Sequence, residues 1–173
     1  FGYPDASLVS LSPGTLNVNA ASSEFTVSGS VNLMDYVGNA ASQVVTIEVY
    51  DAGNNLVQMF VGNLDASSNY SFSCTLPAGT YTLKAKASHW LRQNAVKVMD
   101  GSSNQTVNFS LVNGDCDGDN EVGIGDYSVL SASYGSSLGE SGYTDAADLS
   151  GDEAIDIADY AILSANYGTL GDD

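Results

Sequence analysis

Apolar and polar residues alternate with a period of two through much of the first two-thirds of the chain. The alternation occupies five runs, at residues 25–33, 45–49, 70–76, 81–87 and 107–111. Strands with one buried and one solvated face produce this pattern in antiparallel sheets. Turn-forming residues separate the runs, as at Gly53, Pro77 and Gly101. Roughly seven short strands in this stretch predict an immunoglobulin- or prealbumin-like β-sandwich.

The pattern changes to a helical period in the last third. Apolar residues recur at Tyr127, Leu130 and Tyr134, and Gly135 follows as a stop signal. The same spacing returns at residues 160, 163 and 167, followed by Gly168. Two short helices are therefore predicted, with a shorter connecting helix at residues 143–147.

These patterns divide the chain into three parts. Residues 1–22 form an N-terminal extended segment, in which 8–11 and 16–18 read as extended pieces. We expect them to add a strand to their own sandwich or to a neighbouring molecule. Residues 23–112 form the β-sandwich, and 113–173 form a small all-α unit. The short junction at residues 112–114 favours packing between the two units, because a long flexible linker is missing. The start at Phe1, without a signal-peptide pattern, is typical of a processed or excised piece.

The charge of the chain argues against some classes of function. The formal net charge is −17, and residues 114–173 carry fourteen of the 21 acidic residues without a lysine or arginine. Four lysines and arginines cannot form a basic patch, which argues against nucleic-acid binding. No run of 18 apolar residues indicates a membrane span. The low lysine content and the many Ser, Asn, Thr and Gly residues favour an extracellular or cell-surface location.

An acidic twelve-residue loop occurs twice, with equivalent residues 33 positions apart. The copies read Asp115-Cys-Asp-Gly-Asp-Asn-Glu-Val-Gly-Ile-Gly-Asp126 and Asp148-Leu-Ser-Gly-Asp-Glu-Ala-Ile-Asp-Ile-Ala-Asp159. Oxygen ligands at loop positions 1, 3, 5 and 12 are the pattern that wraps a calcium ion, with a backbone carbonyl at position 7. The sequence therefore predicts two Ca²⁺ sites, each formed by a loop followed by a helix.

Each predicted site draws its ligands from one loop. Site 1 comprises Asp115, Asp117, Asp119, the carbonyl of Glu121 and Asp126; site 2 comprises Asp148, Ser150, Asp152, the carbonyl of Ala154, Asp156 and Asp159. Position 6 requires a positive φ, which Asn120 tolerates better than Glu153. Site 1 is predicted to bind more tightly, because site 2 also has Ser150 in place of a carboxylate. Val122 and Ile155, at position 8, are expected to pack inward and tie the loops together.

This arrangement resembles a dockerin module over residues 114–168, with an Ala146-Ala147-Asp148 entry to the second copy. The resemblance implies a cohesin-type protein partner and a pseudo-two-fold axis that permits two docking orientations. It places the partner contacts at Ile124, Gly125, Ser128, Ser131, Ala132, Ile157, Ala158, Ala161, Ser164 and Ala165. The chain lacks the Lys or Arg often present there, so the resemblance to a charged type I interface is incomplete. Ile124 and Ile157 favour an apolar contact, either with the partner or with the adjoining β-sandwich. Alternatively, one copy faces the sandwich and the other faces outward.

The preceding region has a second resemblance. Leu76-Pro-Ala-Gly-Thr-Tyr-Thr-Leu83, after Val45-Thr-Ile-Glu-Val-Tyr-Asp51, is similar to the carboxypeptidase-regulatory or collagen-adhesin B-type sandwich. Such modules imply a spacer or stalk.

Other candidate residues lie in the β region. Trp90, beside His89 and Arg92, either caps the sandwich core or stacks on a carbohydrate. Asn69, Asn104 and Asn108 fit the N-glycosylation pattern. The two cysteines, Cys74 and Cys116, are expected to be free thiols or to form one bridge between the units.

Three interpretations of function follow. A single histidine and carboxylates committed to calcium argue against an enzyme. The leading hypothesis is an extracellular adaptor whose dockerin-like unit binds a cohesin-type partner. The alternative is a subunit of a self-assembling surface filament or layer, using strand addition or head-to-tail contacts between identical subunits. Carbohydrate binding through Trp90 is the third.

Overall fold

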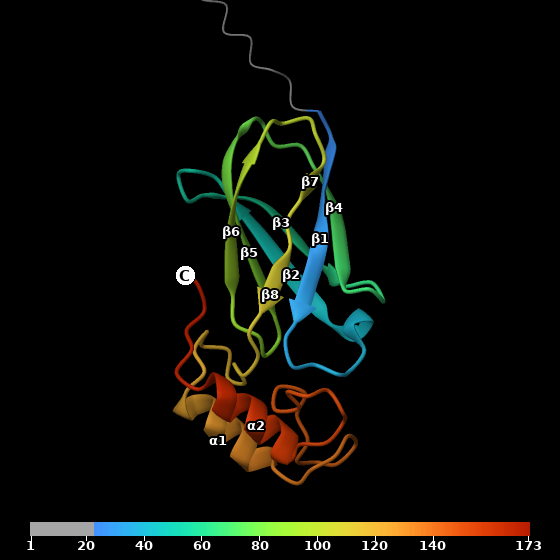
Figure 1. Cartoon of the computed structure of the whole chain (residues 1–173), viewed down its shortest axis with the longest axis vertical. Coiled ribbons are helices and arrows are strands. Elements are labelled where there is room, and N and C mark those ends of the chain that lie inside the picture. Colours follow the sequence, from blue (N-terminus) through green and yellow to red (C-terminus); the bar gives the residue numbers. More distant parts are fainter. Residues whose placement is uncertain (1–22) are drawn as a thin grey trace, which may run out of the picture.

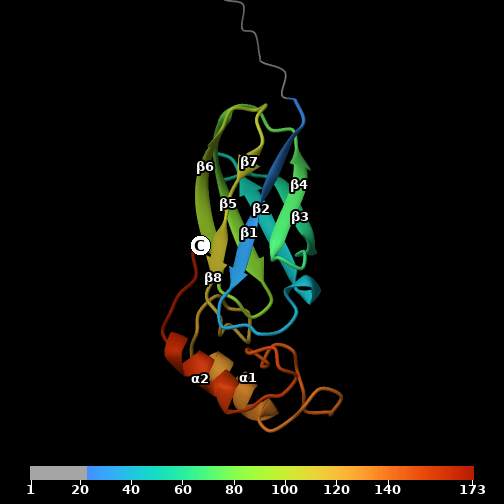
Figure 2. The same ribbon diagram turned by 45° about the vertical axis from the view of Figure 1, so that its right-hand side comes forward.

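The computed structural model describes residues 23–173, in which eight strands precede two helices. The pieces expected at residues 8–11 and 16–18 lie outside the described residues. Figures 1 and 2 show the strands extending along the molecule and the two helices side by side at one end. The strands are β1 (Phe25–Leu33), β2 (Val44–Tyr50), β3 (Leu56–Asn63), β4 (Asn69–Cys74), β5 (Gly79–Ala87), β6 (Gln93–Met99), β7 (Gln105–Thr106) and β8 (Phe109–Leu111).

Two four-stranded sheets enclose one apolar cluster. In one sheet β1 lies between β4 and the β7 and β8 strands, and the other sheet has the order β3-β2-β5-β6. Val27 and Val31 of β1 and Ile47 and Leu83 of the second sheet are all fully buried in this cluster. The buried positions are those that the period of two predicts, because alternate side chains of a strand share one face. A short 3-10 helix, η1 (Ala40–Ser42), precedes β2.

The expectation of purely antiparallel sheets is wrong at one edge. β1 pairs with β7 and β8 in parallel, with Val27 opposite Gln105 and Val31 opposite Phe109. No hairpin joins these strands, since β1 begins the domain and β7 and β8 end it. Only strands joined by a tight turn must pair antiparallel, so β1 can pair in parallel with β7 and β8.

The strands β3 and β6 escaped the sequence prediction. They form the two edges of the second sheet. In β3 the outward residues Met59 and Val61 are apolar, and in β6 Val96 and Val98 are outward and more than 70% exposed. The outward positions of both strands thus carry apolar residues where the pattern expects polar ones. The period of two therefore cannot be recognised in their sequences.

The helices α1 (Ile124–Ser133) and α2 (Ile157–Asn166) confirm the predicted helical period. The glycines that follow them, Gly135 and Gly168, have φ values of +85° and +84°, a conformation that favours glycine and ends each helix. The connecting helix expected at residues 143–147 is wrong, because this segment forms turns. No helix in residues 23–173 has the length and apolar character needed to cross a membrane.

Backbone and side-chain contacts join the helical region to the sheets. The amides of Gly114 and Asp115 both donate to the His89 carbonyl at 2.9 Å, and the Val37 amide donates to the Ser150 carbonyl at 2.8 Å. Leu91, from the β5–β6 connection, is buried in the apolar cluster of the helical region. These contacts agree with the packing that the short junction predicts.

Candidate functional site

The two acidic loops have matching backbone conformations. Residues at loop positions 4 and 6 have positive φ in both, with values of 83° and 70° for Gly118 and Asn120 and 77° and 71° for Gly151 and Glu153. The positive φ expected at position 6 is therefore present twice. A glutamate there costs on the order of 1 kcal/mol relative to glycine, so loop 2 carries strain that loop 1 avoids with asparagine.

The position 1 aspartates organise the loops from inside. Asp115 is 1% exposed and Asp148 is 5% exposed. The Oδ1 atoms accept hydrogen bonds from the amides of Gly118 and Gly151, each at 2.8 Å. Their Oδ2 atoms accept from the amides of Asn120 at 3.2 Å and Glu153 at 2.9 Å. One carboxylate thus binds the backbone at positions 4 and 6 of its own loop.

The position 12 aspartates connect each loop to its helix. Asp126 accepts from the amide of Asp117 at 3.1 Å and from Gly123 at 2.6 Å. In loop 2, Asp159 accepts from Ser150 at 2.8 Å and from Asp156 at 2.8 Å. Both position 12 side chains are buried. The first turn of each helix therefore holds a carboxylate inside the loop.

Three carboxylates lie close together in loop 1, an arrangement typical of a cation site. Carboxylate oxygens of Asp115, Asp117 and Asp126 lie within 4.8 Å of one another. The pKa of Asp117 is raised above its usual value by desolvation and by the neighbouring carboxylates of Asp126, Asp119 and Asp115. In loop 2, burial raises the pKa of Asp159. A bound divalent cation would offset this repulsion.

The donor set fits calcium. The predicted ligands are carboxylates, the Ser150 hydroxyl and the carbonyls of Glu121 and Ala154, and oxygen atoms of these kinds are the ligands that Ca²⁺ prefers. The Ser150 hydroxyl at position 3 of loop 2 is buried and has no hydrogen-bond partner within the described residues. An ion in loop 2 would satisfy this oxygen.

The residues at positions 3 and 11 vary together. A Cβ atom on Gly125 would lie 2.0 Å from Oδ2 of Asp117, so glycine makes room for the longer side chain. In loop 2 the shorter Ser150 takes position 3 and Ala158 takes position 11. The shorter residue at position 3 of loop 2 is therefore accompanied by a larger residue at position 11.

Val122 and Ile155 are fully buried, as predicted, and their backbones pair with post-helix segments. The Val122 amide donates to the Thr169 carbonyl at 2.9 Å, and the Ile155 amide donates to the Ser136 carbonyl at 2.9 Å. Each loop thus pairs with the segment that follows the helix of the other repeat. The side chains of Val122 and Ile155 belong to one buried apolar cluster, in agreement with the expectation that they pack inward and tie the loops together.

The outer face of the helices carries most of the predicted partner contacts. Ile124 and Ile157 are 70% and 65% exposed, so the alternative that they pack on the sandwich is wrong. Since both are exposed, the alternative with one copy facing the sandwich is wrong as well. The other predicted contacts lie on the surface too: Ser128, Ser131, Ala132, Ala158, Ala161, Ser164 and Ala165 are exposed, and Gly125 is half-buried.

Four tyrosines on this face were missed as contact residues. The helical period suggested a buried face, yet only Leu130 and Leu163 are buried, and Tyr127, Tyr134, Tyr160 and Tyr167 are 40–56% exposed. Their recurrence at equivalent positions of both repeats was the available signal, since the ion does not require them. We call these four tyrosines, with Ile124 and Ile157, the tyrosine face.

The tyrosine face has two equivalent hollows. One, of about 370 Å³, lies among Ile124, Tyr127, Tyr160, Leu163, Ser164 and Tyr167. The other, of about 380 Å³, lies among Ile157, Tyr160, Tyr127, Leu130, Ser131 and Tyr134. Exchanging each residue for its equivalent in the other repeat, 33 positions away, converts one set into the other. The rings of Tyr127 and Tyr160 meet edge to face between the hollows, with centroids 6.3 Å apart.

Trp90 does not offer a sugar-stacking platform. Its side chain is fully buried in the core between the sheets. The indole Nε1 donates to the Met34 carbonyl at 3.2 Å, and its ring meets Tyr36 edge to face. The structure therefore supports the packing interpretation of Trp90.

The remaining candidates have simple positions. Cys74 and Cys116 are both buried and free, without a bridge between them. Burial raises the pKa of the Cys116 thiol to about 12, which makes it a poor nucleophile. The three candidate glycosylation residues, Asn69, Asn104 and Asn108, are all exposed.

His89 gives a prediction that tests the junction between the two regions. The residue is 3% exposed, and burial lowers its pKa to about 4. We expect the only histidine signal of the chain to show no titration between pH 7 and 5 in an NMR experiment. The unfolded chain takes up this proton below pH 6.5 and the folded chain only near 4, so His89 makes stability fall as pH decreases through this window. A midpoint near pH 6.5 would contradict the buried junction.

Comparison with known proteins agrees with this geometry. Residues 113–166 match the family model of the dockerin type I domain. A chain in the crystal structure of a C-terminal interface mutant of a type II cohesin–X–dockerin complex from Acetivibrio cellulolyticus has the same fold, with a TM-score of 0.68 and 22% identity. The match covers 85% of this chain and 97% of that one, and an N-terminal interface mutant of the same complex gives the same values. No curated protein matches the sequence.

These findings describe a non-enzymatic protein-docking module with a mostly β-sheet N-terminal region. Dockerin domains are generally calcium-binding and typically extracellular or located at the cell surface.

Proposed function

We propose that this chain is an extracellular, calcium-dependent adaptor that docks to a cohesin-type partner through the tyrosine face. In this proposal residues 113–173 are the docking unit, and the β-sandwich at 23–112 is its spacer. The observation that carries the proposal is the pair of equivalent apolar hollows, which are lined by exposed residues of α1 and α2. Figure 1 shows these two helices together at one end of the molecule. Exposed aromatic clusters of this kind are typical of protein contacts.

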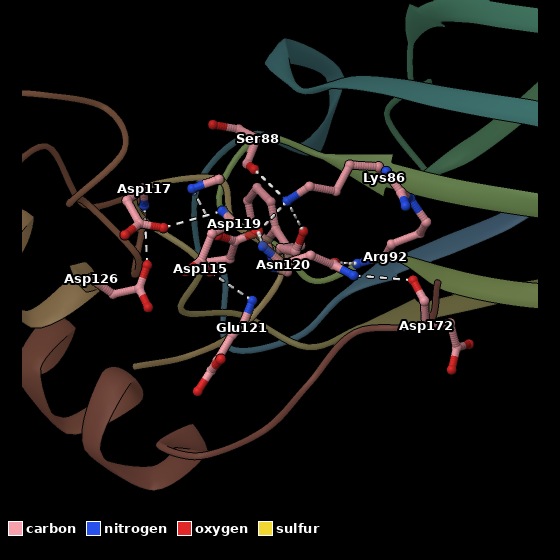
Figure 3. A network of polar contacts seen from close by, with 12 residues as sticks. Lys86, Ser88, Arg92, Asp115, Asp117, Asp119, Asn120, Glu121, Asp126 and Asp172 are labelled. Atoms are coloured by element: carbon pink, nitrogen blue, oxygen red, sulfur yellow. Dashed lines mark hydrogen bonds and ion pairs between the residues drawn. The ribbon is translucent and has the colours of Figure 1, made fainter. Parts of the chain in front are cut away.

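Calcium has a structural role in this proposal. Two ions would be held by the carboxylates at positions 1, 3, 5 and 12, by Ser150 and Asp156, and by the carbonyls of Glu121 and Ala154. Figure 3 displays the loop 1 side chains that would hold the first ion. Because Asp126 and Asp159 belong to both a loop and a helix, filling the loops would fix the helix ends that present Ile124 and Ile157.

The charge and the symmetry of the docking unit indicate what kind of partner surface would fit it. Residues 114–173 carry fourteen acidic residues and no lysine or arginine, so the docking unit as a whole is strongly acidic. We expect a partner with protruding apolar side chains inside a neutral or basic rim. The equivalence of the two hollows would let that partner bind in either of two orientations.

Calcium titration of the full chain tests this function. Calorimetry is expected to count two ions, and capture of cohesin domains is expected in calcium and not in chelator. The site left intact in Asp148→Ala should bind more tightly than the site left in Asp115→Ala, because site 1 has three clustered carboxylates and no glutamate strain. The opposite order would contradict the ranking, and capture that is insensitive to chelator would contradict the calcium-dependent face.

A second candidate function is a subunit of a surface filament or layer. The observation that favours it is the exposed tyrosine face, which could contact a second copy of the chain; pairing of this face with itself closes a dimer, so a filament would need a further head-to-tail or strand-addition contact. Electron microscopy of the purified chain in calcium separates the candidates. Ordered polymers without an added partner would support the subunit, and monomers that capture a cohesin domain would support the adaptor.

A further inference from the structure

Lys86 of β5 reaches from the sheets into calcium loop 1. Its ammonium donates to Oδ2 of Asp115 at 2.5 Å, to the Trp90 carbonyl at 2.6 Å and to the Ser88 carbonyl at 3.1 Å. The Lys86 side chain is 24% exposed and that of Asp115 is fully buried. Figure 3 shows the ammonium on the side of Asp115 that faces the sheets. Three acceptors thus fix a positive charge against the position 1 carboxylate.

Loop 2 lacks this arrangement. The equivalent atom, Oδ2 of Asp148, accepts from the neutral hydroxyl of Tyr143 at 2.7 Å. His89 faces Asp148, but burial keeps the imidazole neutral near pH 7. Among the described residues, Lys86–Asp115 is the only pair of opposite charges in contact. The two repeats therefore differ in the charge next to their position 1 aspartates.

This difference changes the energy of the metal-free loops. A buried carboxylate is costly unless a cation or several hydrogen bonds compensate it. In loop 1 the ammonium supplies that compensation when calcium is absent. When calcium binds, two cations share one carboxylate and repel each other in a partly buried setting, where charge interactions are stronger than in water.

We propose that Lys86 is a resident counter-cation of loop 1, which holds the metal-free loop against the β-sheet region and lowers the affinity of site 1 for calcium. The inference rests on the proposed calcium binding by loop 1. It adds that a charged side chain of the spacer sets the affinity of site 1 directly, whereas within the described residues no charged side chain of the spacer pairs with a carboxylate of loop 2.

For calcium affinity, the repulsion between the Lys86 ammonium and the ion outweighs the help that Lys86 gives in orienting Asp115. The carboxylate also accepts hydrogen bonds from the amides of Gly118 and Asn120, which would hold it in the calcium-bound loop when Lys86 is replaced. Loss of the ammonium therefore leaves the ligand in place and removes the repulsion. The result is tighter calcium binding together with a less stable metal-free loop.

The test compares Lys86→Met with Lys84→Met in the full chain. Lys84 is on the same face of β5, and its ammonium donates to the Asp173 carbonyl at 2.7 Å, outside the loop. NMR titration with calcium chloride follows the amides of Gly118 and Gly151, which report loops 1 and 2 separately. Lys86→Met is expected to tighten calcium binding at Gly118 about tenfold and to leave Gly151 within twofold, whereas Lys84→Met changes neither.

Hydrogen exchange in chelator provides the second readout. The amides of Gly118 and Asn120 are expected to lose protection in Lys86→Met and to keep it in Lys84→Met and in the unmodified chain. Lys86→Arg retains the charge and should keep calcium affinity near that of the unmodified chain. If Lys86→Met does not fold without calcium, Lys86→Gln, which keeps a donor for the Trp90 carbonyl, takes its place.

The outcomes separate this inference from the proposed function. Unchanged or weaker calcium binding at Gly118 in the neutral variants would overturn the role of Lys86 and leave the docking function intact. An unmodified chain that binds no calcium would overturn the calcium-dependent function, and the role of Lys86 with it.

Discussion

Replacing Tyr127 and Tyr160 together with serine is expected to weaken partner binding at least a hundredfold. Both rings line both hollows of the tyrosine face and meet at its centre. Loss of a central aromatic contact typically costs about 2–4 kcal/mol of binding energy. A partner that docks in either orientation meets both tyrosines, so reversal of the partner cannot restore the contact.

The isoleucines give the contrasting case. Ile124 lines one hollow and Ile157 lines the other. Ile124→Ala is expected to reduce binding only a few-fold when both orientations are available, because the partner can reverse and use Ile157. Surface plasmon resonance with a captured cohesin domain measures each variant. Equal losses for Ile124→Ala and for the double tyrosine variant would indicate a single docking orientation.

A matched control for the tyrosine variant comes from the β-sandwich. Tyr50→Ser removes a partly exposed tyrosine from β2, and its hydroxyl donates to Glu48 at 3.1 Å. This control should leave partner binding unchanged. Calcium binding should persist in the double tyrosine variant, since no tyrosine of the face belongs to a loop. Loss of calcium binding there would show that the variant damages the fold rather than the face.

Trp90→Ala is expected to lower the free energy of unfolding by about 3–5 kcal/mol, the range for removal of a large buried aromatic side chain. The side chain is fully buried, and the backbone of Trp90 forms a bridge with Asn113 at the junction. A loss of this size lowers the melting temperature by roughly 10 °C in a chain of this length. Urea unfolding in saturating calcium measures the change.

Trp90→Phe provides the graded control, because it keeps a ring in the core and loses the hydrogen bond from Nε1 to the Met34 carbonyl. Its loss should be smaller than that of Trp90→Ala. A change below about 1 kcal/mol in Trp90→Ala would contradict the buried position, since such values are typical of surface sites. Glycan binding abolished by Trp90→Ala without loss of stability would revive carbohydrate stacking.

The sequence predicts those strands whose two faces differ in polarity. Val27, Val45 and Leu83 alternate with polar residues, and each is buried as expected. The edge strands β3 and β6 were missed because residues such as Met59 and Val96 leave apolar side chains in solvent. Parallel pairing of β1 with β8 was missed because strand order depends on contacts between residues far apart in the sequence, which local periodicity does not contain.

In the site, too, local sequence predicts some features, whereas others depend on contacts between residues far apart in the sequence. The backbone of the loops was predictable at position 6, because the calcium-loop pattern requires a positive φ there and both Asn120 and Glu153 have one. The ligand set stays a prediction. The tyrosine face was only partly predictable, since a helical period of aromatic residues is equally typical of a buried stripe. The contact of Lys86 with Asp115 joins residues 29 positions apart through tertiary packing, so no sequence motif announces it.

The crossed pairing of loops and post-helix segments determines how the chain tolerates shortening. The amides of Val122 and Gly171 and the carbonyls of Asn120 and Thr169 link the last residues of the chain to loop 1. Proteolytic trimming after Tyr167 would consequently damage the first repeat, although the cut lies beside the second. Neither repeat is a self-sufficient building block, because each completes the backbone of the other. A chain with a single repeat would need a second molecule to supply the missing segment.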